Sequence, residues 1–141
     1  ISTGDAQVDV FSKVLNSMFR NVTEVSGIQN TGTDLVLTPV VEDFQYTLPK
    51  ETKVKMYEVW LKYNITVHDG QGQLIADWIL TSYGKSPSEF IKTDENALNE
   101  ALIMALRDAG ARLAIGFIRV PEIRNWLEQR KRRQDQDVAS I

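Results

Sequence analysis

The sequence contains no cysteine, one histidine and four prolines in 141 residues. Without cysteine the chain has no disulfide, no thiolate metal site and no cysteine nucleophile. No apolar run approaches the roughly 20 residues of a membrane-spanning helix. No sign of charge dominates either: the net charge is −3, so the composition gives no overall attraction to nucleic acid. These absences exclude disulfides, cysteine-based metal or catalytic sites and a membrane-spanning helix. The composition that is left is that of an ordinary globular chain.

The remaining composition is that of one globular domain. Hydrophobic residues make up 43% and charged residues 25% of the chain, and its length is sufficient for a single buried core. We expect one domain over residues 1–133 and a flexible tail over residues 134–141. Because the chain begins at Ile1 and not at methionine, we also expect a processed or trimmed product from which any signal peptide has already been removed. This start allows a secretory origin without showing one.

The strongest periodic signal lies between residues 56 and 83. Apolar side chains alternate with mostly polar ones from residue 56 to residue 68, which predicts a strand with one face in the core. The turn DGQG at 69–72 and a returning strand over residues 74–83 complete a long hairpin. A preceding strand is predicted over residues 34–46, with a bulge or a sheet edge at Pro39. A shorter strand is predicted over residues 21–25.

Three helices are predicted around these strands. Apolar residues recur at spacings of three and four over residues 5–20 and again, with many alanines, from Thr93 or Asp94 to about Phe117. Pro121 fits the first turn of a last helix, which should end near Arg133. The order predicts an α+β fold: one antiparallel sheet with a long central hairpin, two main helices packed on one face, and a short C-terminal helix.

Three polar stretches are candidate chemical sites, and each has a plainer interpretation. His68 and Asp69 are adjacent on a strand and point to opposite faces, which favours a solvated turn histidine over an acid–base pair. Glu42 and Asp43 diverge in the same way and have no third ligand at a suitable spacing. Residues 83–88, YGKSPS, lack the first glycine of a phosphate-binding loop and are expected to form a plain loop. We predict no catalytic, cofactor-binding or metal-binding residue.

The aromatic side chains of the hairpin and the last helix have two interpretations. Trp60 lies on the polar face of its strand, and the turn could bring Trp78 within cross-strand reach. The two rings either pack beneath a helix, which we favour, or form an exposed patch. In the second case Trp60, Trp78, Tyr83 and Trp126 form a docking surface.

A basic cluster, RKRR, ends the last predicted helix. Arg130, Lys131, Arg132 and Arg133 could simply complement the helix dipole, which is the plainer interpretation. They could also contact an anionic surface, either acidic lipid headgroups or a nucleic-acid backbone. Because the chain as a whole is acidic, nucleic acid is not the expected partner.

Four stretches together resemble a known group of proteins. They are TGDAQVDVFSKVLNSMFRNVTEV at 3–25, DLVLTPVVEDFQY at 34–46, YNITVHDGQGQLIADWILTSYGK at 63–85 and NALNEALIMALRDAGARL at 96–113. In pattern they resemble the small outer-membrane lipoproteins of Gram-negative bacteria, of the lipopolysaccharide-assembly and curli-secretion type. The resemblance covers most of residues 3–118. The lipid-anchoring cysteine of such proteins is absent, and the resemblance implies that it stood upstream of Ile1.

The resemblance implies a non-enzymatic protein on the periplasmic side of the outer membrane. Such a protein would be tethered by a lipid anchor and would dock other envelope proteins or a second copy of itself, without a cofactor. The alternative is an intracellular regulatory or small-ligand-binding domain that holds its ligand on the sheet, near Trp60, Trp78 and Tyr83. An enzyme is not expected, because no nucleophile, base and stabilising group can be assembled from these residues.

Overall fold

A computed structural model describes residues 3–27, 32–49, 56–87 and 93–139 of the chain. The elements follow in the order α1 (Thr3–Met18), β1 (Leu35–Thr47), β2 (Met56–Asp69), β3 (Leu74–Pro87), α2 (Asp94–Gly116), a 3-10 turn η2 (Phe117–Arg119) and α3 (Pro121–Ala139). The three strands form one antiparallel sheet in the order β1-β2-β3. The predicted α+β class is therefore confirmed.

The turn between β2 and β3 and a register shift beside it together set the pairing of the hairpin. The Asp69 N–H donates to the Gln73 carbonyl at 2.9 Å, and Gly72 has the positive φ of 86° that the predicted turn requires. The Asp69 carboxylate accepts from the N–H groups of Gln71 and Gln73, each at 2.9 Å. The register then shifts by one residue between Val67 and His68, which places Trp60 opposite Tyr83 and Ile65 opposite Trp78.

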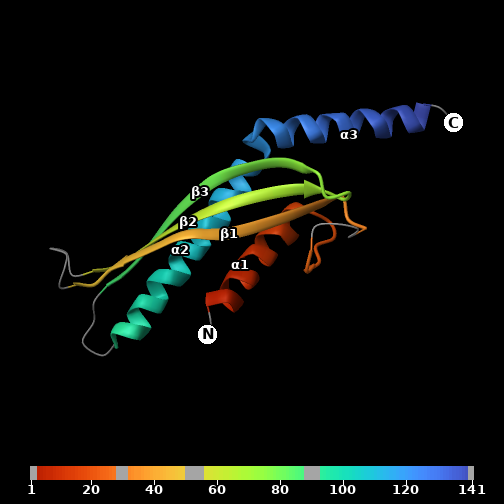
Figure 1. The fold of residues 1–141 in the computed structure, drawn as a ribbon. Helices are drawn as coiled ribbons and strands as arrows, with labels where there is room; N and C mark the ends of the chain where they lie inside the picture. Colours follow the sequence, from red (N-terminus) through yellow and green to blue (C-terminus); the bar gives the residue numbers. More distant parts are fainter. Residues whose placement is uncertain (1–2, 28–31, 50–55, 88–92, 140–141) are drawn as a thin grey trace.

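Helices α1 and α2 cover one face of the sheet (Figure 1). The predicted alternation in β2 is correct, since its apolar positions are all buried on this face: Tyr57, Val59, Leu61, Tyr63, Ile65 and Val67. From α1, Phe11 packs edge-on against Tyr63 with ring centroids 5.4 Å apart, and Gln7 accepts from the Tyr63 hydroxyl at 2.9 Å. The α2 alanines allow that helix to lie close to the strands.

Gly84 marks the closest approach between helix and sheet. A Cβ at this position would lie 2.2 Å from the Ala101 carbonyl oxygen and 2.3 Å from the Ala105 nitrogen. The glycine thus serves packing, and it does not end the strand. Consequently β3 continues to Pro87, whereas the sequence predicted a loop from Gly84 onward.

Two further predictions differ from the structure and one is confirmed. Residues 21–25 form no strand. Pro39 lies on an edge strand, as predicted, and the bulge of this strand falls between Val41 and Asp43. The last helix continues to Ala139 instead of ending near Arg133, so residues 134–139 are helical and this helix is not short.

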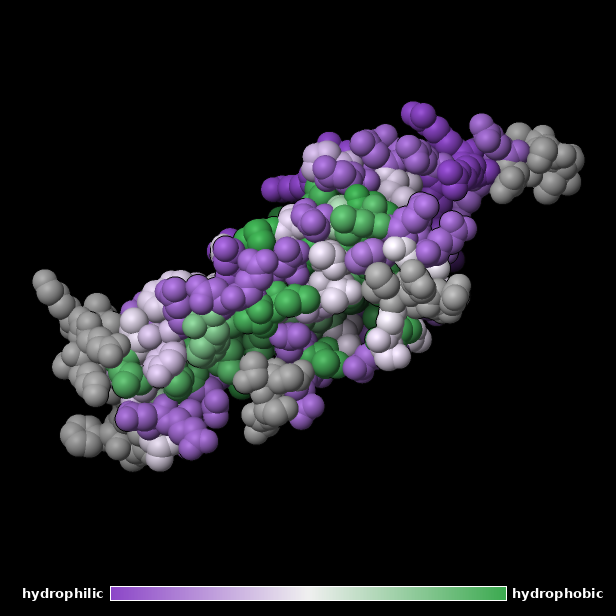
Figure 2. Space-filling model, in the orientation of Figure 1, coloured by the Kyte–Doolittle hydropathy of each residue, from purple (hydrophilic) through white to green (hydrophobic). Residues whose placement is uncertain are grey.

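Helix α3 packs against the core along its first half. Ile123 is fully buried and Leu127 packs against the core, whereas residues 131–136 are exposed. Figure 1 shows the helix leaving the body of the molecule beyond β3, and Figure 2 shows it to be almost wholly hydrophilic. Among the described helices, α3 included, none has the length and apolar character of a membrane span.

Candidate docking surface

The sheet face opposite α1 and α2, called the open face below, carries an exposed aromatic pair. Trp60 of β2 and Tyr83 of β3 are register partners, and their ring centroids lie 5.4 Å apart. The two residues are 38% and 36% exposed. The Tyr83 hydroxyl donates to the Glu58 carboxylate at 2.6 Å, and this bond, together with desolvation, raises the pKa of Tyr83 to about 12. The pair is therefore held rigidly while remaining accessible.

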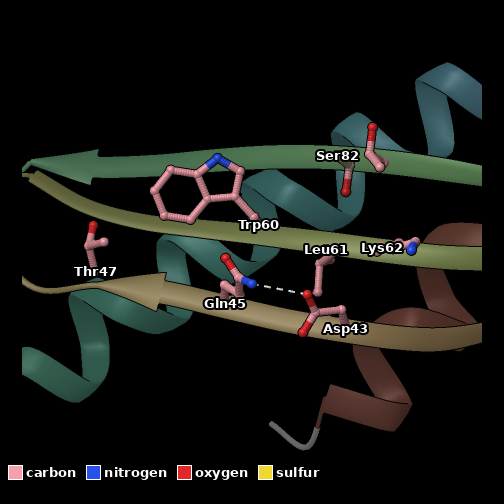
Figure 3. Close-up of a pocket in the computed structure, with 8 residues that line it drawn as sticks. Asp43, Gln45, Thr47, Trp60, Leu61, Lys62 and Ser82 are labelled. Atoms are coloured by element: carbon pink, nitrogen blue, oxygen red, sulfur yellow. Dashed lines mark hydrogen bonds between the residues drawn. The ribbon is translucent and has the colours of Figure 1, made fainter.

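A hollow of about 440 Å³ lies beside Trp60. Figure 3 shows the indole over one end of it, with side chains from all three strands around it. Its lining is Asp43, Gln45, Thr47, Trp60, Leu61, Lys62, Thr81 and Ser82. The register with β2 places the polar residues of β1 on the same face as Trp60. An aromatic platform ringed by hydrogen-bonding groups suits a partner that is partly apolar and partly polar.

Most of the polar groups around the hollow already have partners. Gln45 donates its amide to Asp43 at 3.1 Å (Figure 3), and Lys62 lies 3.7 Å from the Glu42 carboxylate. Glu42 also accepts from the Asn64 amide at 3.3 Å. These exposed contacts are individually weak and can be exchanged for contacts with a partner. Glu42 thus contacts Lys62 and Asn64, and Asp43 contacts Gln45. The two neighbouring carboxylates do not act as a pair.

The structure separates the four predicted docking residues. Trp78 lies on the helix-covered face opposite Ile65, with its ring 6.3 Å from that of Phe117, so it does not join Trp60. Trp126 lies on α3, where the Arg130 guanidinium sits 5.2 Å from its ring centre. Trp60 and Tyr83 alone form a common surface. The expectation that both hairpin tryptophans pack beneath a helix holds for Trp78 and is wrong for Trp60.

The basic cluster lies elsewhere, at the hairpin turn. Arg130 pairs with Asp34 at 2.7 Å and, with Arg133, borders a polar pocket of about 310 Å³ beside the turn. Lys131 and Arg132 are exposed on α3. One of the four cations is therefore engaged within the fold, and the cluster is not continuous with the Trp60–Tyr83 pair.

Neither of the other predicted polar sites assembles further groups. The Asp69 carboxylate is used by the turn amides, as described above. His68 is only part-exposed, and its Nδ1 is buried with no hydrogen-bond partner, so it is not the solvated turn histidine that was expected. Within the described residues, no three His, Asp or Glu side chains gather as metal ligands would. Residues 83–87 belong to β3 rather than to a loop.

The sequence prediction missed the polar lining of the hollow. Lys62 and Thr81 could have been found, because the period of two places them on the same face as Trp60 and Tyr83. Gln45 and Thr47 could not be found in the same way. Their facing depends on the bulge between Val41 and Asp43, which shifts the β1 register by one residue.

No family model matches the chain, and no curated protein matches it. The lipopolysaccharide-assembly and curli-secretion families therefore gain no support from sequence. Among solved structures, the fold is similar to that of "a putative lipoprotein from Caulobacter crescentus CB15". The TM-score is 0.59 at 11% identity, over 89% of this chain and 83% of that one. At this identity the likeness shows a shared fold.

Proposed function

We propose that this chain is a non-enzymatic protein of the bacterial cell envelope that binds other envelope components on the open face of its sheet. The exposed Trp60–Tyr83 pair beside the hollow is the observation that carries the proposal. Rigid aromatic side chains ringed by polar groups are typical of the centres of protein interfaces. The fold shared with a putative lipoprotein supports the envelope assignment. In its finer form, the proposal places the chain on the periplasmic side of the outer membrane, tethered by a lipid anchor.

The location and the docking surface are tested together in cells of the source organism. A photo-crosslinking residue replaces Thr81, which is exposed beside the hollow, and a control carries the same residue at Ile115, which is 62% exposed on α2. The expected result is recovery with the membranes and a crosslink to an envelope protein from position 81 only. The crosslink should disappear when Trp60 and Tyr83 are both replaced by alanine. Recovery in the cytosol, or equal crosslinking from both positions, would refute the proposal.

A second candidate function is the binding of a small ligand in the same hollow. Its volume of about 440 Å³ and mixed lining favour this alternative, since small-ligand sites fall in this range of size. Ligand binding would change the fluorescence of Trp60. A compound that changes the signal of the wild-type protein but not that of Trp60→Phe would favour this function over protein docking.

A further inference from the structure

The two edges of the sheet are not equivalent. On β3, the Tyr83 N–H that points away from β2 donates to the Asp108 carboxylate of α2 at 3.0 Å, so the helix occupies this edge. Gly84 beside it lies directly against the α2 backbone. On β1, no described element other than β2 hydrogen-bonds to the backbone of the strand. The β3 edge is therefore closed at residues 83–84, whereas the β1 edge, called the open edge below, carries no partner among the described elements.

Only the first half of the open edge has features that disfavour pairing with another strand. Pro39 cannot donate a hydrogen bond, and the bulge between Val41 and Asp43 interrupts the regular strand. Beyond the bulge, residues 43–47 form a regular edge. On the helix side of this segment, Phe44 and Tyr46 are 42% and 52% exposed, with ring centroids 5.9 Å apart.

The directions of the backbone groups on this segment follow from the closed edge. Because the Tyr83 N–H points away from β2, Trp60 directs its N–H and C=O toward β1 and pairs with Gln45 through hydrogen bonds. The backbone groups alternate along a strand, so those of Phe44 and Tyr46 point outward. The open edge thus presents two N–H and two C=O groups between two exposed aromatic rings.

We propose that this edge pairs antiparallel with the same edge of a second copy of the chain, about a two-fold axis at Gln45. This register sets Phe44 opposite the partner's Tyr46, and Tyr46 opposite the partner's Phe44. The four outward groups of each copy then have partners, and the aromatic rings of both copies gather on one side. Asp43 lies opposite Thr47 of the partner subunit, so no two like charges are directly opposed. The segment is self-complementary, as a two-fold interface requires.

Pairing at this edge would also enlarge the candidate docking surface. Gln45 and Thr47 line the hollow beside Trp60 and lie on the strand that forms the contact. The hollows of two copies therefore meet across the axis on one continuous six-stranded sheet. This inference deepens the proposed function by naming a second copy as one partner, and in that respect it rests on the proposed function.

The absence of cysteine makes the proposed register directly measurable. In Gln45→Cys, the two cysteines face each other across the axis, and their Cα atoms lie about 4.5 Å apart. This distance is within the range of a disulfide. Mild oxidation should convert this variant to a covalent dimer. Lys85→Cys, which is exposed on the far strand, is the control and should stay monomeric.

Two further cysteine variants test the register itself. Asp43→Cys and Thr47→Cys should each fail to crosslink alone, because like positions lie about 14 Å apart across the axis. A mixture of the two variants should crosslink. Crosslinking of each variant alone, or equal crosslinking at Lys85→Cys, would indicate random collisions and would overturn the register.

Sedimentation of the untagged protein tests the association without any crosslink. Wild-type protein and Tyr46→Phe should sediment with twice the monomer mass at about 0.1 mM, a concentration that populates even weak dimers. Tyr46→Pro should be monomeric, because it removes an outward N–H without removing a bond to β2. A monomeric wild-type protein with no Gln45→Cys crosslink overturns self-pairing and leaves the envelope proposal standing. A correct dimer recovered from the cytosol overturns the envelope proposal alone.

Discussion

Replacement of Gly84 by alanine should separate α2 from the sheet. The added Cβ would meet two backbone atoms of α2 at 2.2 and 2.3 Å, roughly 1 Å inside the shortest tolerated contact. Neither atom can move by a side-chain rotation. The helix must therefore shift as a body, and it carries a buried stripe from Ala97 to Leu113.

The cost of this shift can be estimated from packing. A gap of about 1 Å removes up to roughly half of the dispersion energy at a contact, and overpacking of a core costs about 1 to 3 kcal/mol even when side chains can adjust. Because only backbone is involved here, we expect Gly84→Ala to lower the free energy of unfolding by about 3 kcal/mol or more. The melting temperature should fall by about 10 °C or more.

The matched control is Gly116→Ala at the end of α2. A Cβ there meets nothing within 4 Å, and the backbone is in the right-handed helical region. This variant should be neutral or more stable by up to about 1 kcal/mol, since alanine is the better helix former. Thermal and urea unfolding followed by circular dichroism measure both variants. Equal stability of Gly84→Ala and wild-type protein would refute the argument that Gly84 is required for close packing.

Two further predictions follow from the positions of the aromatic residues. Trp78→Ala should lower the free energy of unfolding by about 3 kcal/mol, because the Trp78 ring packs against the core. Trp60→Ala should lower it by only about 1 kcal/mol, because the Trp60 ring lies on the open face. Urea unfolding that ranks the two variants in the reverse order would contradict these positions. The pKa values of Tyr63 and Tyr83 are both raised from 10.0 to about 12, the first by burial and the second mainly by its hydrogen bond to Glu58. The stability they contribute is intact below pH 10 and is lost as the pH rises toward about 12. The hydrogen bond to Asp94 raises the pKa of Tyr57 as well. Tyrosinate absorbance should therefore show three late-titrating tyrosines, and only two in Glu58→Gln; simultaneous titration of all tyrosines near pH 10 would exclude the effect.

The fold was largely predictable from periodicity, because burial imposes it directly. The alternation around Tyr63 identified the buried face of β2. The start of α2 was predicted at Thr93 or Asp94, and Thr93 is the cap, since its side chain accepts from the Asn96 N–H at 3.1 Å. Local signals failed where a distant element decides the structure. Gly84 resembles a strand breaker until α2 is placed against it, and the end of β3 was missed for this reason.

The candidate site was only partly predictable. Trp60 and Tyr83 were identified, but Trp78 was grouped with them although it lies opposite Ile65 on the helix-covered face. Counting pairs outward from the turn would not have placed Trp78 there, because the register shifts by one residue between Val67 and His68. The open edge at Phe44 and Tyr46 could not be predicted, since it depends on which strand lies outermost and on what α2 covers.

The order of the elements has a consequence for how the chain folds during synthesis. The strands and α2 follow one another along the sequence and pair with their neighbours, so most of their contacts close short loops. Helix α1 is different, because Phe11 needs Tyr63 and Phe19 packs against Phe117 at 5.5 Å between ring centres. Of these elements, α1 is therefore the first to be made and the last to find its place. Until residue 117 has been made, its apolar side remains uncovered, and this is the interval in which the nascent chain most needs a chaperone.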